Sequence, residues 1–145
     1  MPRRAHMPDL TKSSLVAATD AAASQDAVSH FGDLLRFETD CWDVHHDLVS
    51  GTDAFVLLDV RSPDLFDGGH VPGARNLPHG RINERNLEGY PADSLFVVYC
   101  AGPHCNGADK AALRLAGLDR PVKKMIGGIE GWLDEGFDLE RSPTQ

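Results

Sequence analysis

Two short apolar runs constrain the fold of this chain more than any other feature of its sequence. They cover residues 55–60 (FVLLDV) and 95–99 (LFVVY), and almost no polar residue interrupts them. Continuous apolar runs of this length are typical of strands buried on both faces of a parallel sheet. Weaker patterns predict strands over 74–77 and 122–126, the second partly exposed because it contains two lysines.

Helical patterns precede, separate and follow these strands. Either Thr39 or Asp40 is suited to begin the second of the predicted helices and Gly51 to end it. Buried strands that alternate with helices predict an α/β domain with a mostly parallel central sheet flanked by helices. Apolar residues at helical spacing predict helices over the ranges 26–36, 39–49 and 106–115, and a short last helix after residue 128.

Size and charge narrow the classes of function. The chain has 145 residues, about the size of one domain, and carries 14 Lys and Arg against 22 Asp and Glu, for a net charge of −8. This acidity argues against nucleic acid or an anionic membrane as a partner. No apolar run approaches the roughly 20 residues of a membrane span. Three cysteines are too few for a disulfide scaffold, so we expect a cytoplasmic protein with one special thiol.

The N-terminal residues differ in composition from the rest. Residues 1–24 are rich in Ala, Ser and Thr and predict a mobile leader, in which charged residues leave no apolar stretch typical of a signal peptide. Residues 25–145 then form a single domain. Within it we expect an N-terminal helical segment over 24–50 and a core over 52–137.

A loop with two cysteines follows the second apolar run. Cys100 is the first residue after the predicted strand, and Cys105 comes just before the predicted helix. Ligands of parallel sheets bind beyond the carboxyl ends of the strands, where backbone N–H groups and a helix N-terminus stabilise anions. Cys100 is therefore expected to be more acidic than a free thiol and reactive as a thiolate. The alternative is a buried, inert cysteine at the end of a strand.

Three motifs in order carry a family resemblance. Leu-Asp-Val-Arg at 58–61 precedes Gly-His-Val-Pro-Gly-Ala-Arg-Asn at 69–76, Val-Val-Tyr-Cys ends at Cys100, and Gly-Gly-Ile-Glu-Gly-Trp covers 127–132. With these motifs, the chain from about 55 to 137 resembles the rhodanese domain, a sulfurtransferase family that also has non-catalytic members. The resemblance implies a three-layer α/β fold with Cys100 as the catalytic residue.

The resemblance also implies a mechanism and a set of site residues. Cys100 would take the sulfane sulfur of a small donor such as thiosulfate or mercaptopyruvate as a persulfide and pass it to a thiol, a protein or cyanide. Such a relay needs no metal and no organic cofactor. Asp59 and Arg61 would support the site through charge-assisted hydrogen bonds. The substrate-binding loop would consist of Ala101, Gly102, Pro103, His104, Cys105 and Asn106.

The loop departs from the family pattern in two ways. Many members carry an Arg or Lys in this loop, whereas its one ionisable residue here besides the thiols is His104, which disfavours the thiosulfate dianion. Asn106 stands where phosphatase relatives have Arg, which disfavours phosphate or arsenate chemistry. An alternative function is a non-enzymatic rhodanese module for redox sensing or protein interaction.

Cys105 allows three interpretations. It could resolve the Cys100 persulfide by releasing sulfide and leaving a disulfide, it could protect Cys100 from overoxidation, or it could merely pack under the loop. A zinc site made by Cys100, His104 and Cys105 is disfavoured, because it lacks a fourth ligand and paired Cys-x-x-Cys spacing. Structural roles are expected for His70, Cys41 and Trp132.

Overall fold

The computed structural model describes residues 13–143 of the chain. Backbone contacts divide the chain into two units, Met1–Gly32 and Asp33–Gln145. The first unit contains a short 3-10 helix, η1 (Val16–Ala18), and most of helix α1 (Ser24–Phe37), and none of its described residues is buried. The first half of the predicted leader, residues 1–12, lies outside the described residues.

The second unit is built on one five-stranded sheet. The strand order is β1-β5-β4-β2-β3, and every neighbouring pair is parallel. The fold class predicted from the sequence is confirmed, because the two continuous apolar runs form the neighbouring strands β4 and β2 inside the sheet. The strands are β1 (Glu38–Thr39), β2 (Val56–Asp59), β3 (Arg75–Asn76), β4 (Phe96–Tyr99) and β5 (Val122–Met125).

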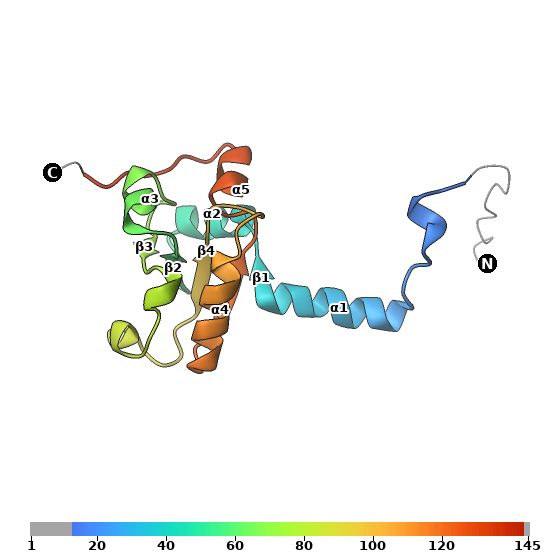
Figure 1. The fold of residues 1–145 in the computed structure, drawn as a ribbon, viewed down its shortest axis with the longest axis horizontal. Helices are drawn as coiled ribbons and strands as arrows, with labels where there is room; N and C mark the ends of the chain where they lie inside the picture. Colours follow the sequence, from blue (N-terminus) through green and yellow to red (C-terminus); the bar gives the residue numbers. More distant parts are fainter. Residues whose placement is uncertain (1–12, 144–145) are drawn as a thin grey trace. The chain divides into compact units, whose positions relative to one another are not determined.

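Helices cover both faces of this sheet and give three layers (Figure 1). Alternate residues of β4 enter different cores: Val97 and Tyr99 pack with α2 (Cys41–Ser50) and α5 (Gly128–Asp134). Phe96 and Val98 pack with α4 (Gly107–Gly117) on the other face. All four residues of β4 are buried, so this strand sits at the centre of the molecule's hydrophobic core.

The predicted ends of α2 are confirmed by its caps. The side chain of Asp40, not Thr39, accepts a hydrogen bond from the backbone N–H of Asp43 at 2.8 Å. Gly51 ends the helix with φ of 75°, a left-handed conformation that glycine adopts at little cost. Helix α4 ends at Gly117, two residues beyond the predicted range of 106–115.

Several short elements were not predicted from the sequence. Strand β1 has two residues, too few to show a period. Helix α3 (Pro63–Gly68) has only six residues. Its N-cap Ser62 and the proline in its first turn are typical signals for the start of a helix. The 3-10 helices η2 (His79–Arg81) and η3 (Arg85–Leu87) were not predicted either, nor was η1 within the expected leader. None of the helices within 13–143 is long and apolar enough to cross a membrane.

Candidate functional site

Strand β4 delivers Cys100 to the carboxyl edge of the sheet, directly before a tight loop. Cys100 is only 7% exposed and packs with the α4 side of the core. The loop folds back on itself, because the backbone N–H of Cys105 donates to the carbonyl oxygen of Gly102 at 3.0 Å. Helix α4 begins at Gly107, so its N-terminal end, which carries partial positive charge, adjoins the loop.

Helix α5 holds the first residues of this loop from the other side. The backbone N–H of Ile129 donates to the carbonyl oxygen of Cys100 at 3.1 Å, and that of Glu130 donates to Ala101 at 2.9 Å. This approach requires glycine at position 128, where φ is +58° and a Cβ would collide with the carbonyl oxygen of Cys100. The Gly-Gly pair therefore fixes the backbone of the cysteine loop.

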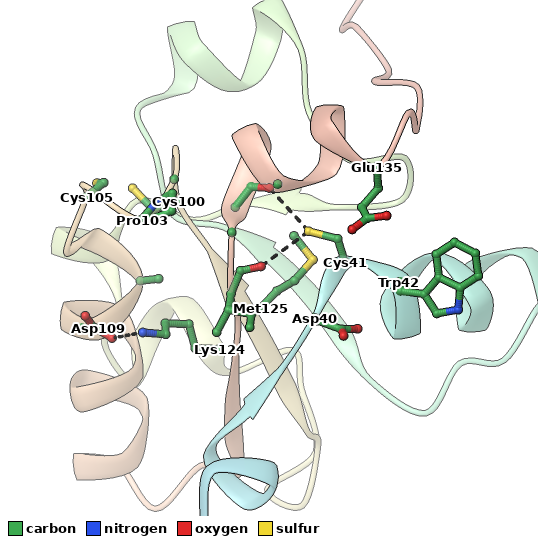
Figure 2. A pocket seen from close by; sticks show the side chains of 16 residues that line it. Asp40, Cys41, Trp42, Cys100, Pro103, Cys105, Asp109, Lys124, Met125 and Glu135 are labelled. Atoms are coloured by element: carbon green, nitrogen blue, oxygen red, sulfur yellow. Dashed lines mark hydrogen bonds and ion pairs between the residues drawn. The ribbon is translucent and has the colours of Figure 1, made fainter. Parts of the chain in front are cut away.

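A pocket of about 600 Å³ opens beside Cys100 and Cys105 (Figure 2). Cys41 lies across from these thiols, where its Sγ is 3.5 Å from the carbonyl oxygen of Ile126 and 3.7 Å from that of Gly128. The pocket is large enough for a small molecule or a side chain of a partner. Its remaining walls are residues 40–42, Gly102, Pro103, Ala108, Asp109, 124–128, Gly131 and Glu135.

The charge of the pocket is predominantly negative. Asp40, Asp109 and Glu135 line it, and the one basic residue in its lining is Lys124. Lys124 Nζ is itself engaged, at 2.9 Å from Asp109 Oδ1 and 3.9 Å from Glu38 Oε1. A dianion entering the pocket therefore meets carboxylates and an ammonium group that is already neutralised.

The two loop thiols share one small space above the N-terminus of α4. A Cβ built on Gly107 would lie 2.8 Å from Cys100 Sγ and 3.5 Å from Cys105 Sγ, so both sulfur atoms flank the same point. Cys105 Sγ is also 3.5 Å from the backbone N–H of Gly107, which donates to it. The absence of a side chain at Gly107 is what lets the sulfurs approach.

The pKa of Cys100 differs from the sequence prediction. Burial, together with a hydrogen bond to Cys105, raises the pKa of Cys100 to about 11. The same hydrogen bond from Cys100, and that from the Gly107 N–H, lower the pKa of Cys105. The prediction that Cys100 is more acidic than a free thiol is therefore wrong, and within the pair Cys105 has the lower pKa.

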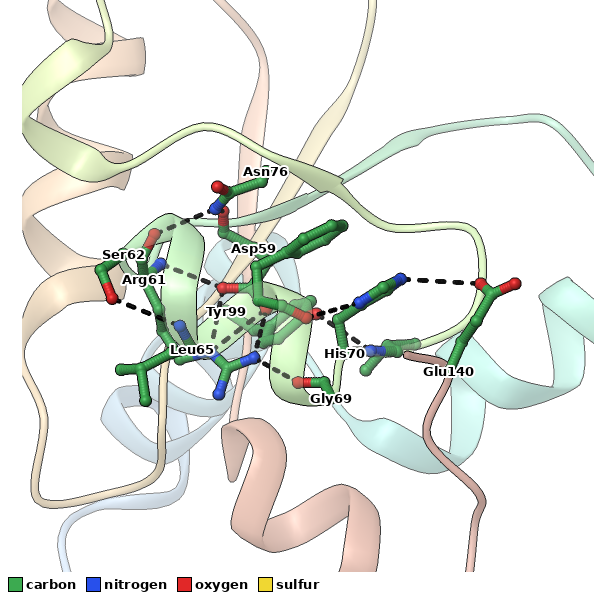
Figure 3. Close-up of polar contacts among 11 residues, drawn as sticks. Asp59, Arg61, Ser62, Leu65, Gly69, His70, Asn76, Tyr99 and Glu140 are labelled. Atoms are coloured by element: carbon green, nitrogen blue, oxygen red, sulfur yellow. Dashed lines mark hydrogen bonds and ion pairs between the residues drawn. The ribbon is translucent and has the colours of Figure 1, made fainter. Parts of the chain in front are cut away.

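Asp59 and Arg61 form a buried ion pair at the end of β2 (Figure 3). Arg61 Nη2 is 2.7 Å from Asp59 Oδ2, and Nε is 3.0 Å from Oδ1. Nη2 also donates to the carbonyl oxygen of Gly69 at 2.6 Å. The structure thus joins these two predicted supporting residues to each other and to the following loop, but neither lines the pocket.

The other predicted residues occupy different places. Ala101, His104 and Asn106 do not line the pocket, and the exposed His104 lies 3.6 Å from Glu130. The Nδ1 of His70 is 2.7 Å from the carbonyl oxygen of Phe66. Trp132 is buried in the core as expected.

Much of the pocket wall has no signal in the sequence. Trp42 lines it and is 62% exposed, whereas its neighbour Cys41 faces the core, so periodicity alone could not separate their roles. In the sequence, Lys124 indicates only that its strand is partly exposed. Within 13–143 no group of three or more His, Cys, Asp or Glu side chains is arranged to hold a metal ion.

A family model described as the rhodanese-like domain matches residues 43–135. The chain belongs to this family. The matched region includes the cysteine loop, the Asp59–Arg61 pair and the Gly-Gly turn. The crystal structure of the BH2092 protein from Bacillus halodurans superposes with a TM-score of 0.80 and 35% identity, covering 82% of this chain and 87% of that one.

Relatives of this rhodanese-like chain have different described roles. It is 35% identical over 80 residues to the thiosulfate sulfurtransferase GlpE of Pseudomonas putida, covering 53% of this chain and 68% of the relative. It is 32% identical over 85 residues to the HTH-type transcriptional regulator Rv0324 of Mycobacterium tuberculosis, covering 59% and 37%. Because it spans only 37% of that regulator and 59% of the YqhL protein of Bacillus subtilis, a relative's whole activity does not transfer to it.

Proposed function

We propose that this rhodanese-like protein is a sulfurtransferase that carries sulfane sulfur as a persulfide on Cys100. The observation that carries the proposal is the position of Cys100, at the end of β4, beside the N-terminus of α4 and in the lining of a pocket. A thiolate in such a place can reach a small donor, and helix and loop N–H groups stabilise the persulfide anion that results.

The thiol pair supplies the nucleophile for loading. In its thiolate form, which the lowered pKa favours, Cys105 is the base that receives the proton of Cys100 as Cys100 attacks the donor. The sulfane sulfur bonds to Cys100 Sγ, and the bond to the donor's remaining group breaks with the electron pair leaving on that group. Loading therefore ends with a persulfide on Cys100 and a neutral thiol on Cys105.

The charge of the pocket predicts which donors load Cys100 fastest. Three carboxylates against one paired lysine repel thiosulfate, a dianion, more than mercaptopyruvate, which carries one carboxylate. A persulfide of a small zwitterionic thiol, such as cysteine persulfide, meets the least repulsion. We therefore expect loading in the order cysteine persulfide, mercaptopyruvate, thiosulfate, and delivery to a thiol or protein acceptor.

Intact-mass spectrometry tests the proposal. Reduced wild type and Cys100→Ser are incubated with each of the three donors, and the mass is read after removal of excess donor. The expected result is the gain of one sulfur atom on the wild type and none at that site in the variant, with peptide mapping to Cys100. A wild type that gains no sulfur from any donor contradicts the proposal and favours the alternative, a redox-sensing or interaction module.

A further inference from the structure

Cys105 is placed to do more than accept a proton. We propose, on the basis of the sulfurtransferase function above, that Cys105 resolves the Cys100 persulfide, so that the protein releases sulfur as hydrosulfide and passes through a Cys100–Cys105 disulfide. The pair would thereby act as an internal acceptor and couple sulfur delivery to the supply of thiol reductant.

The approach of the two sulfurs carries this inference. Cys100 Sγ and Cys105 Sγ flank the position that a side chain at Gly107 would occupy, with the ideal Cβ 2.8 Å from one and 3.5 Å from the other. Cys100 also donates a hydrogen bond to Cys105, which raises the pKa of Cys100 and lowers that of Cys105. Both cysteines are free thiols in this structure.

The two cysteines differ in exposure, and this difference indicates which one carries the persulfide and which one attacks it. Cys100 is buried, whereas Cys105 is partly exposed on the loop. The outer sulfur of a persulfide on Cys100 has room in the pocket that both residues line, while the inner sulfur stays beside Cys105. Cys105 can therefore attack the inner sulfur, and the outer sulfur can leave into the pocket.

The step is balanced without an outside oxidant. The thiol sulfur of Cys105 attacks Cys100 Sγ, the bond between Sγ and the outer sulfur breaks, and its electron pair leaves with the outer sulfur. The proton of Cys105, gained during loading, goes to this leaving group, which departs as HS⁻. The outer sulfur is reduced and the two cysteine sulfurs are oxidised to a disulfide, which a dithiol reductant must reduce before the next cycle.

The pocket favours an internal acceptor over a small anionic one. Sulfite and thiolates from solution are anions, and they approach through walls that carry Asp40, Asp109 and Glu135. Cys105 is already inside the site and needs no such approach. Its effective concentration exceeds that of any dissolved thiol, because the loop holds it beside Cys100.

The test compares wild type with Cys105→Ser after identical loading. Both are loaded with cysteine persulfide, freed of donor by gel filtration without reductant, and followed by intact mass and by sulfide assay. The wild type should lose the added sulfur with release of one equivalent of sulfide and end two hydrogens lighter than the reduced protein, at a rate about tenfold or more above that of the variant. Peptide mapping should place the disulfide between Cys100 and Cys105.

Two further measurements separate the possible failures. The rate should not change on dilution, since the step is intramolecular. Gly107→Ala, which keeps both thiols but occupies the space between them, should slow sulfide release per loaded sulfur. Loading of both proteins with equal rates of sulfide release would overturn the resolving role and leave the sulfurtransferase standing, whereas failure of wild type to load would overturn both.

Discussion

At the residue scale, the two loop thiols differ in burial and in ionisation. Cys100 is held at the end of a buried strand, and its proton is retained by desolvation and by Cys105. Cys105 is more exposed and ionises first, since Cys100 and the Gly107 N–H both donate to its sulfur. The two thiols therefore titrate as a coupled pair, and the reactivity of each depends on the protonation of the other.

Removal of Cys105 should make Cys100 more acidic. The hydrogen bond and the charge of Cys105 both raise the pKa of Cys100, so Cys105→Ser lowers that pKa and increases the thiolate fraction at a given pH. Alkylation of Cys100 by iodoacetamide, quantified by peptide mapping, should then begin at lower pH and run severalfold faster near neutrality. Cys100→Ser should have the opposite effect on Cys105. A Cys100 profile that stays in place or moves to higher pH would refute this coupling.

The buried ion pair should contribute strongly to stability. Arg61→Leu leaves the carboxylate of Asp59, which is 0% exposed, without its cation, and an uncompensated buried charge costs about 3–5 kcal/mol. Urea denaturation should show this loss. The matched control is Arg36→Leu, which breaks an exposed pair with Asp33 and should cost less than about 1 kcal/mol. Equal losses in the two variants would argue against a structural role for the buried pair.

At the element scale, the sequence predicted the framework and not the pocket. The apolar runs of β2 and β4 and the caps of α2 are local signals, and local signals suffice to place these elements. The pocket depends on segments brought together by the fold, such as Cys41 beside Gly128, whose carbonyl oxygen lies 3.7 Å from Cys41 Sγ, and no spacing in the sequence encodes that contact. The acidity of Cys105 also escaped prediction, because it arises from contact with Cys100.

Substitution of the second glycine of the Gly-Gly turn should damage the cysteine loop. Gly128→Ala combines a positive φ of +58° with a collision against the carbonyl oxygen of Cys100, and we expect a loss of about 1–3 kcal/mol and a larger fall in sulfur loading. Urea denaturation and loading by intact mass measure the two effects. Gly136→Ala is the matched control, because its φ of +82° is equally strained but no atom lies within 4 Å of the Cβ. If Gly136→Ala impairs loading as much, the contact with the loop is not the cause.

At the scale of the whole molecule, the net charge of −8 and the acidic pocket act in the same direction. Both oppose the entry of anionic donors, and the opposition weakens as salt screens it. One residue of the pocket, Lys124, has the charge to attract an anionic donor. Its ammonium group is instead paired with Asp109, whose Oδ1 lies 2.9 Å from Nζ. Under the proposed function, a few carboxylates would therefore set the preference among donors, and changing them would leave the thiols unaltered.

If Cys100 is loaded as proposed, release of Lys124 should speed its loading from thiosulfate. Asp109→Asn removes one negative charge and exposes the Lys124 ammonium to the pocket, so the rate of Cys100 loading from thiosulfate should rise roughly threefold to tenfold at low salt. Loading from cysteine persulfide should change little. The measurement is the rate of mass gain with each donor at two ionic strengths, and the gain for thiosulfate should shrink at high salt.

The control for this charge effect is Glu88→Gln, which changes the net charge by the same amount but lies outside the pocket. An increase confined to Asp109→Asn places the barrier in the pocket, beside Lys124. An equal increase in both variants would assign the barrier to the field of the whole molecule and contradict the local explanation. Because Asp109 and Lys124 leave the cysteine pair untouched, sulfide release from the loaded protein should be the same in both variants, so the choice of donor and the fate of its sulfur are separable properties.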